Sequence, residues 1–397
     1  MSTVKERYLA NIVTEDVQEK MIFMGGPRQV GKTTLAWMVA NKFTCPVYLN
    51  WDARQHRTRI LEEQWSPDTD FLVLDEVHKY RHWKSHVKGI WDTREEGLKL
   101  IVTGSSKLNM YRRSSDSLMG RYYYVRLHPF SMAEINGYFP DTEDNRAEEE
   151  PLQLVFRSPL HNMESLLTFG GFPEPFLKGS KRTLKRWQNQ RFERIFREDI
   201  RDTENIRFLS QVELLGQLLP ERVASPISIK SLSEDIEAGP KTVKNWLDLL
   251  ERNYFIFRVP PYHKRLERAL KKESKYYLWD WSEVGKENAR FENLLAGHLL
   301  KYCHLRQDAF GDDIGLHYVR DKSKREVDFL ITWNSEPWLL AEAATNQRHS
   351  LTNLSYFARK LNVSQAYLVT LEDRRDYIDK RTGIRVIPAN TFLTAFV

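Results

Sequence analysis

The sequence predicts an α/β protein built around a parallel sheet, and two observations carry that prediction. The segment from Gly26 to Thr33, GPRQVGKT, fills the phosphate-loop pattern G-x-x-x-x-G-K-[ST] at every position. Three short apolar runs, residues 21–24, 71–74 and 100–103, lead into turns or polar residues, which is typical of parallel strands covered on both faces. At 397 residues the chain is long enough for two or three domains, so we expect this sheet to form only the first.

The phosphate loop stands between an expected strand, residues 21–24, and an expected helix, residues 34–41. Backbone N–H groups of such a turn and helix start point at phosphate oxygens. We expect ATP here, with Lys32 on its β- and γ-phosphates and the Thr33 hydroxyl on Mg²⁺. The alternative is a glycine turn before an ordinary core helix. The residues expected to bind nucleotide are Gly26, Pro27, Arg28, Gln29, Val30, Gly31, Lys32, Thr33 and Thr34.

The second apolar run ends in two carboxylates, Asp75 and Glu76. Open α/β sheets bind ligands at the carboxyl ends of their strands. Hydrolysis of ATP needs a metal ion that neutralises the triphosphate and a group that positions the attacking water. We therefore expect Asp75 to hold Mg²⁺ and Glu76 to orient and polarise water. The alternative is an ordinary acidic loop after a strand.

Two further positions are candidates for contact with the γ-phosphate. Residues 100–103 lead into Gly104 and Ser105, and a polar side chain there can act as the sensor of the γ-phosphate; a plain Gly-Ser turn is the alternative. Arg121 precedes another expected strand, residues 122–127. It is either a surface charge or an arginine finger, which stabilises charge on the transferring phosphoryl group.

The chain resembles the prokaryotic AAA+ ATPases that carry a C-terminal domain of uncharacterised function. The matching stretches are GGPRQVGKTTLA, FLVLDEVHKY, LIVTGSSKLNM, GRYYYVRLHPFS, FGGFPEPFL and REVDFLI. The resemblance implies a P-loop AAA+ core, a winged-helix-like middle and a C-terminal domain related to restriction endonucleases. It also implies that Arg121 is the finger and that Ser105 or Ser106 is the sensor. We expect a homo-oligomer, with a hexamer as one such form.

Composition fits several packed domains and excludes a disordered chain, because 41% of the residues are hydrophobic. The net charge of +6 permits nucleic acid as a partner without proving it. Cys45 and Cys303 lie far apart, and we expect both to be reduced core residues of a cytoplasmic protein. We expect no membrane association, since no apolar run approaches a membrane span and the first residues lack a signal-peptide core.

The expected domain boundaries follow from breaks in periodicity. The acidic stretch 141–151 reads as a loop near the end of the α/β core. A basic helix, residues 181–201, carries Arg191 among its cations; it is either a solvated helix packed by its apolar stripe or a helix that contacts phosphates or another subunit. The expected domains are a AAA+ core at 1–150, a helical linker or lid at 151–205, a winged helix at 206–275 and an endonuclease-like domain at 276–397.

The middle of the chain has a helix-turn-helix pattern. Residues 228–236 form a short amphipathic segment, and Pro240 begins a second helix after the turn at Gly239. A strand at 254–259 and a basic stretch follow, which completes a winged-helix order. The alternative is a module that only packs domains together. The expected DNA contacts are Lys241, Lys244, Asn245, Lys264 and Arg265.

The last domain has part of a PD-(D/E)xK nuclease pattern. Glu292 lies on an expected helix, and Asp328 and Glu342 lie on two expected strands. Carboxylates in that order bind Mg²⁺ in such nucleases, and a lysine two residues after the last one assists the water. Here that position holds Ala344. We therefore expect a fold remnant that binds and does not cut.

The sequence thus predicts a Mg²⁺-dependent ATPase that binds and remodels DNA, with branched DNA as one candidate. One alternative is a nucleotide-switched module whose accessory domains bind protein. Another is an ATP-dependent nuclease. Binding to DNA that weakens steeply with salt would separate the first prediction from the protein-binding alternative.

Overall fold

The computed structural model describes residues 6–104, 118–139, 152, 158–200, 208–263, 273–346, 349–372 and 374–397. The chain divides into two compact units. The first comprises Met1–Pro129 and Phe139–Glu143, and the second comprises Phe130–Tyr138 and Asp144–Val397. Each is described by itself below.

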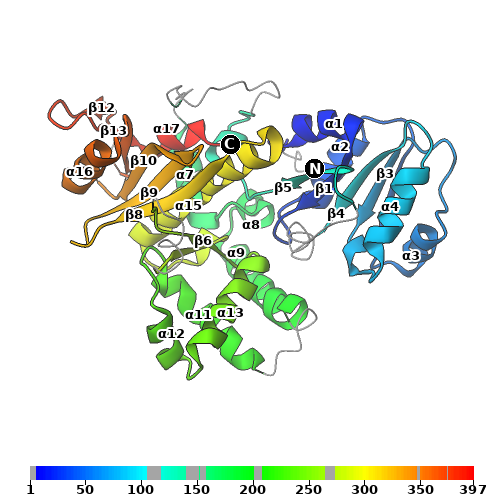
Figure 1. Ribbon diagram of the computed structural model, residues 1–397, viewed down its shortest axis with the longest axis horizontal. Coiled ribbons are helices and arrows are strands. Elements are labelled where there is room, and N and C mark those ends of the chain that lie inside the picture. The colour runs from blue at the N-terminus through cyan, green and yellow to red at the C-terminus, as the bar shows by residue number, and fades with distance from the viewer. Residues whose placement is uncertain are drawn as a thin grey trace. The chain divides into compact units, whose positions relative to one another are not determined.

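The first unit holds a five-stranded sheet in the order β2-β3-β4-β1-β5 (Figure 1). All four neighbouring pairs are parallel. Residues of β1, β3 and β4 are apolar at nearly every position because these central strands are covered on both faces. The sequence prediction of a parallel sheet is confirmed. The strands are β1 Met21–Gly25, β2 Pro46–Asn50, β3 Phe71–Asp75, β4 Lys99–Thr103 and β5 Tyr122–Arg126.

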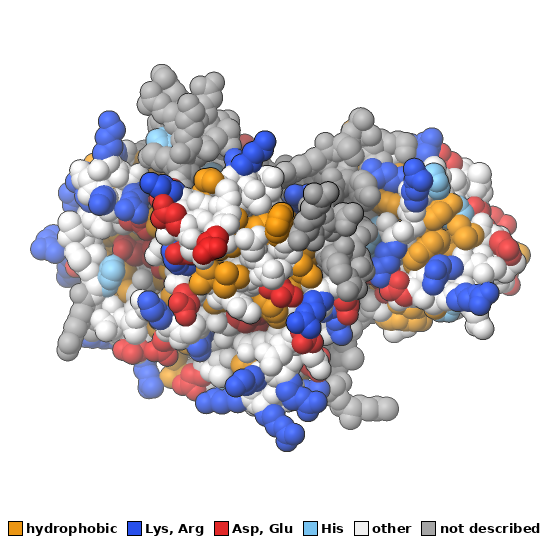
Figure 2. Space-filling model, turned by 90° about the horizontal axis from the view of Figure 1, so that it is seen from below, with side chains coloured by type: hydrophobic (Ala, Val, Ile, Leu, Met, Phe, Trp, Pro, Cys, Tyr) orange, Lys and Arg blue, Asp and Glu red, His pale blue; other side chains and the backbone are white. Residues whose placement is uncertain are grey.

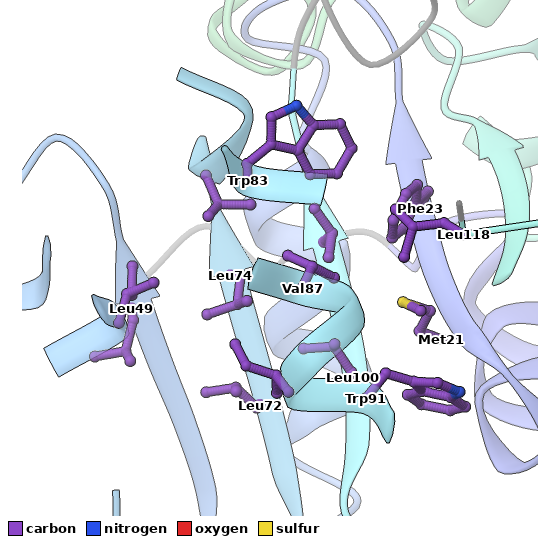
Figure 3. Packing of buried hydrophobic residues seen from close by; sticks show 14 of the residues in the cluster. Met21, Phe23, Leu49, Leu72, Leu74, Trp83, Val87, Trp91, Leu100 and Leu118 are labelled. Carbon is purple, nitrogen blue, oxygen red and sulfur yellow. The ribbon is translucent and has the colours of Figure 1, made fainter. Parts of the chain in front are cut away.

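Helices cover both faces of this sheet. The helix α4 places Trp83, Val87 and Trp91 in one apolar cluster with the strand residues Phe23 and Leu74 (Figure 3). The alternate residues of β1 point to the other face, where α1 and α2 contact the sheet. The helical elements of this unit are α1 Ala10–Glu19, α2 Lys32–Ala40, α3 Arg54–Leu61, the 3₁₀ turn η1 Val77–Lys79 and α4 Trp83–Thr93.

The second unit begins with a largely helical part. Pro240 starts α13 directly after Gly239, as the sequence predicts, and α12 contacts α13. A two-stranded antiparallel pair, β6 with β7, follows. The elements are α6 Met132–Ile135, α7 Leu160–Phe169, α8 Pro173–Lys178, α9 Lys181–Glu193, the π-helical η3 Arg194–Ile200, α11 Leu209–Arg222, α12 Ile229–Asp235, α13 Pro240–Arg252, β6 Ile256–Val259, β7 Lys275–Leu278 and the 3₁₀ turn η4 Trp281–Glu283.

A mixed six-stranded sheet, in the order β12-β13-β11-β10-β9-β8, ends the second unit. The strands β8, β9 and β10 pair antiparallel, and β10, β11 and β13 pair parallel. Helix α16 packs in one apolar cluster with residues of β9, β10 and β11, and α15 contacts β8, β9 and β10. The elements are α15 Glu287–Leu305, the π-helical η5 Arg306–Phe310, β8 Ile314–Arg320, β9 Glu326–Trp333, β10 Glu336–Ala344, α16 Thr352–Leu361, β11 Gln365–Thr370, β12 Tyr377–Ile378, β13 Arg385–Pro388, α17 Ala389–Phe392 and the 3₁₀ turn η6 Leu393–Ala395.

The structure corrects two expectations about single residues. Cys303 is buried, but Cys45 is exposed and is not a core residue. Arg191, expected among the charges of a basic helix, is buried and pairs with Glu283 at 2.8 Å, because α9 turns this side chain into the unit. The acidic stretch 141–151 lies outside the described residues. No helix within the described part of the chain is long and apolar enough to cross a membrane.

Candidate active site

The phosphate loop joins the end of β1 to the start of α2, and its backbone requires glycine. Gly26 has φ +142° and Gly31 has φ +101°, both in the region that side chains disfavour. A Cβ at Gly26 would also collide with the carbonyl oxygen of Leu127. The loop therefore keeps its backbone free of side chains beside the N-terminus of α2, and a backbone of this kind suits a phosphate group.

Lys32 is buried at the start of α2 and lies over the loop. Its Nζ donates to the carbonyl oxygens of Gly26, at 3.0 Å, and Pro27, at 2.8 Å. These contacts place a positive charge inside the curve of the loop, where an anionic ligand would meet it. Contact of Lys32 with the β- and γ-phosphates stays a prediction.

Asp75 is held by hydroxyl groups from three other elements. Its Oδ2 accepts from Thr33 at 3.0 Å and from Tyr48 at 2.6 Å, and its Oδ1 accepts from Thr103. The parallel register explains the contact from Thr103, because Asp75 and Thr103 are paired at the carboxyl ends of β3 and β4; Tyr48 reaches Asp75 from the neighbouring strand β2. Thr33 and Asp75, the two predicted Mg²⁺ contacts, are thus brought together.

Tyr48 and Thr103 were not among the predicted site residues. Burial raises the pKa of Tyr48, and its hydrogen bond to the Asp75 carboxylate raises it further, so the phenol stays protonated and keeps donating. The ring of Tyr48 also stacks on Trp37, with centroids 5.4 Å apart. Thr103, the polar residue that ends β4, was an available signal, whereas Tyr48 lies in the middle of β2, and the order of the strands was needed to use either.

Glu76 follows Asp75 in a left-handed conformation, with φ 59° and ψ 15°. Such a backbone is uncommon for residues other than glycine and turns the side chain away from the line of the strand. The Glu76 carboxylate lies 3.3 Å from Lys79 Nζ, which also pairs with Asp52. Burial disfavours the charged form of Lys79, but these carboxylates outweigh it and raise its pKa.

Arg7 fixes the loop from behind and was also missed by the sequence analysis. Its guanidinium is buried and donates to the carbonyl oxygens of Val30, at 2.6 Å, and His128, at 2.5 Å. One side chain therefore ties the phosphate loop to the segment that follows β5. Nothing in the spacing of a lone arginine near the start of the chain signals this contact.

Arg121 lies at the amino ends of the parallel strands, whereas the phosphate loop lies at their carboxyl ends. It precedes β5, and Tyr122 is paired with Met21, the first residue of β1. The five residues of β1 separate this edge from the loop by about 15 Å. The guanidinium binds Asp92 with two hydrogen bonds, of 2.7 and 3.1 Å, which lower the pKa of that carboxyl. Ser105 and Ser106 lie outside the described residues.

Three of the five residues expected to contact DNA lie on the exposed face of α13. Lys241, Lys244 and Asn245 are exposed, while Val243 and Trp246 on the other side of the helix are buried. Lys264 and Arg265 lie outside the described residues. Figure 2 shows that the Lys and Arg side chains on the face seen from below are mixed with Asp and Glu side chains.

The C-terminal domain brings two of its three predicted carboxylates to one buried lysine, Lys275 of β7. Its Nζ lies 3.1 Å from Glu292 and 3.0 Å from Asp328, and 2.8 Å from Glu326 as well. Glu342 pairs instead with His349, at 2.8 Å. Ala344 ends β10 and is buried. Sequence analysis missed Lys275, although a single lysine in the run KYYLW was a signal.

In this cluster the charged form of Lys275 is stabilised by the carboxylates that surround it. Burial opposes the charged form of Lys275, but Tyr277 and the surrounding carboxylates raise its pKa. Burial and the neighbouring Asp328 raise the pKa of Glu292 to about 8. Lys275 and Arg320 are the cations that pair with these three partly buried carboxylates, and the raised pKa of Glu292 favours its protonated form near neutral pH. Across the described residues no three His, Cys, Asp or Glu side chains are grouped so that they could hold a metal ion.

Three family models match consecutive parts of the chain. A AAA domain matches residues 18–136, a domain of unknown function (DUF8612) matches 160–284, and a second domain of unknown function (DUF4143) matches 288–392. The glycine loop, Asp75 and Arg121 fall within the first match. Lys275 falls within the second, and the carboxylates that surround it fall within the third.

Two similar proteins come from Methanocaldococcus jannaschii and Haemophilus influenzae. The uncharacterized protein MJ1544 of Methanocaldococcus jannaschii is 24% identical over 348 residues, which cover 81% of this chain and 75% of that protein. An uncharacterized protein of Haemophilus influenzae is 20% identical over 358 residues, covering 82% and 83%. Among solved structures, the Walker-type ATPase PABY2304 of Pyrococcus abyssi aligns with a TM-score of 0.41 and 14% identity, covering 71% of this chain and 94% of that one.

Proposed function

Given that this chain is a AAA-type ATPase with two C-terminal domains of unknown function, we propose that it hydrolyses ATP to ADP and phosphate and couples the cycle to DNA binding and remodelling. The observation that carries the first half is that Lys32 bonds the glycine-bounded loop while the next residue, Thr33, bonds Asp75. The AAA domain implies ATP binding. Hydrolysis and the DNA step are the parts proposed here.

Each residue of the proposed site has a separate task. The loop N–H groups and Lys32 bind the β- and γ-phosphates. Thr33 and Asp75 are the residues that would hold Mg²⁺, an ion that neutralises charge on the triphosphate when bound. Tyr48 and Thr103 fix the Asp75 carboxylate in place. Glu76 orients water and accepts its proton, and Ser105 serves as sensor.

Arg121 is proposed to act on the site of a neighbouring subunit. It lies about 15 Å from the loop of its own chain, at the far edge of the sheet. A homo-oligomer, hexameric or otherwise, would bring it to the phosphates of the next chain. In that role Arg121 leaves Asp92 and binds the γ-phosphate, which exchanges one anionic partner for another.

DNA is the proposed partner of the second unit. We propose a lid at 151–205, a winged helix at 206–275 and an endonuclease-like domain at 276–397. The order α11, α12, α13, β6, β7 supports the winged helix, and the exposed Lys241, Lys244 and Asn245 support contact through α13. The order of one helix, three antiparallel strands, a helix and a parallel strand supports the nuclease-like domain.

Cleavage of DNA by this domain is not part of the proposal, because Ala344 stands where the nuclease pattern requires lysine. The competing function is a nucleotide-switched module that binds protein through both accessory domains. A shift assay with single-stranded, duplex and four-way junction DNA at increasing salt separates the two. Affinity that falls steeply with salt supports DNA, since counterion release drives phosphate binding. Absence of binding at low salt to all three substrates contradicts it.

The ATPase proposal is tested at Lys32 and Glu76. Lys32→Ala should abolish nucleotide binding or turnover. Glu76→Gln should still bind ATP, because the loop and Asp75 are intact, but its turnover should fall roughly 10²–10⁴-fold, which is the usual contribution of a general base. Nucleotide binding by calorimetry and phosphate release measure the two effects.

Glu62 supplies a matched control, because it is an exposed carboxylate of the same unit. Glu62→Gln should leave both binding and turnover unchanged. Normal steady-state turnover in Glu76→Gln would remove Glu76 from the water-activating role.

A further inference from the structure

The Lys275 cluster has no part in ATP hydrolysis, and the proposed DNA contacts do not use it. The Lys275 side chain is fully buried. Three carboxylate oxygens surround its Nζ at 2.8–3.1 Å, from Glu292 on α15 and from Glu326 and Asp328 on β9. Its Nζ donates hydrogen bonds to Glu292 and to Asp328, and the Glu326 carboxylate lies 2.8 Å away as an ion-pair partner.

The oxygens that face Lys275 are held in place by other contacts. Tyr277 donates to the same oxygen of Glu292 at 2.7 Å. The second oxygen of Asp328 accepts from the backbone N–H of Ala343 at 3.1 Å. The second oxygen of Glu326 lies 3.2 Å from Arg320. Carboxylates from two elements are therefore preorganised around a point that must be positive.

This point has the character of a cation site. Removing a charge from water is costly unless several opposite charges surround it, and oxygen ligands from separate elements are what hard cations require. Glu342 of β10 is buried as well: its Oε1 pairs with His349, and its Oε2 has no hydrogen-bond partner among the described residues. Ca²⁺ binds oxygens at 2.3–2.6 Å, so the present N–O distances would have to contract by only about half an ångström.

We propose that the Lys275 ammonium takes the place of a divalent cation in the C-terminal domain, so that the domain holds its carboxylates together without metal. The lysine comes from residues matched by one domain of unknown function, and the carboxylates come from the other. Lys275 thus also joins the β6–β7 pair to the mixed sheet. Because Lys275 is part of β7, its ion pairs tie this strand to α15 and β9, which a free metal ion could not do.

The proposal predicts that removal of the ammonium opens a metal site. Nucleotide-free wild-type chain, titrated with Ca²⁺ in a calorimeter, should show no site in this domain. Lys275→Ala should bind one Ca²⁺ per chain, and the double variant Lys275→Ala with Asp328→Asn should lose it. The matched control is Lys301→Ala, because Lys301 is also buried and its ion pair with Glu134 involves none of these carboxylates. It should gain no Ca²⁺ site.

Thermal unfolding keeps the test decisive if Lys275→Ala folds poorly. Lys275→Ala, and Lys275→Met, which retains the apolar stem, should be destabilised in EDTA and restabilised by Ca²⁺, while the wild-type chain should be indifferent to both. Failure of Ca²⁺ to bind or restabilise either variant would overturn the proposal. So would Ca²⁺ binding by the wild-type chain that Asp328→Asn removes. Metal-dependent nicking of DNA by the wild-type chain that Lys275→Ala abolishes would instead identify Lys275 as a catalytic lysine.

Discussion

At the scale of residues, Asp75 illustrates how the order of the strands decides which side chains a residue contacts. Sequence pattern alone linked Asp75 with Thr33, because each belongs to a known phosphate-site motif. The contacts from Tyr48 and Thr103 depend on which strands are neighbours. The order β2-β3-β4 places one polar residue on each side of Asp75, and no local pattern in the sequence encodes that order.

His298 carries a prediction about pH. It is buried on α15, accepts the backbone N–H of Met132 at 3.0 Å, and burial lowers its pKa to about 4. The unfolded chain binds this proton below about pH 6.5, whereas the folded chain binds it only near pH 4. The contribution of His298 to the free energy of unfolding is therefore fully present above the unfolded pKa of about 6.5. It is lost as the pH falls from there through the folded pKa of about 4. Between about pH 7.5 and about pH 5 the loss should be about 2 kcal/mol.

Urea unfolding of the wild-type chain and of His298→Gln at both pH values measures this contribution. His298→Gln should show the smaller loss on acidification. His317, whose pKa burial also lowers to about 4, should leave a residual loss in both proteins. The control is His161→Gln, since His161 is exposed and should not change the pH dependence. Equal losses in wild type and His298→Gln would contradict the assignment.

At the scale of elements, the sequence predicted strongly patterned segments well. The apolar runs became β1, β3 and β4, and the Pro240 signal became the start of α13. It missed β2, an edge strand in which only Leu49 is buried. It also missed β7, whose first residue is the charged Lys275. Edge position weakens apolar periodicity, and a buried ion pair removes it, because both depend on contacts distant in the sequence.

The helix α13 carries the prediction for DNA. Lys241→Ala, Lys244→Ala and Asn245→Ala combined should weaken duplex binding, because two phosphate-contacting cations are lost. The slope of log K against log salt should become shallower by about 2. A series of binding titrations at increasing salt gives both quantities.

A matched pair of charges tests whether the effect belongs to α13. Arg359 and Lys360 are exposed cations at the end of α16, so Arg359→Ala with Lys360→Ala changes the net charge equally. That variant should retain the wild-type slope. Equal weakening by both variants would show a general charge effect in place of a contact through α13.

At the scale of the whole molecule, the proposed role of Arg121 divides the active site between chains. If Arg121 completes the site of its neighbour, Arg121→Ala and Glu76→Gln should each be inactive alone. Mixing them should restore part of the activity, because one kind of interface then pairs an intact Glu76 with an intact Arg121. Activity per chain should also rise with protein concentration. A monomer with full activity at every concentration would refute the role in trans.

Arg121 and the phosphate loop lie at opposite ends of the strands, so the two subunit surfaces that would carry them are different. One edge of the sheet would donate a residue and the other would receive one, so subunits would add head to tail through unlike surfaces. An open row of such subunits always ends in one loop that no arginine reaches. Only closure of the row gives every subunit a complete site. The rate of ATP hydrolysis would then depend on how the subunits are assembled. A single misoriented subunit would inactivate a neighbour whose own residues are all intact.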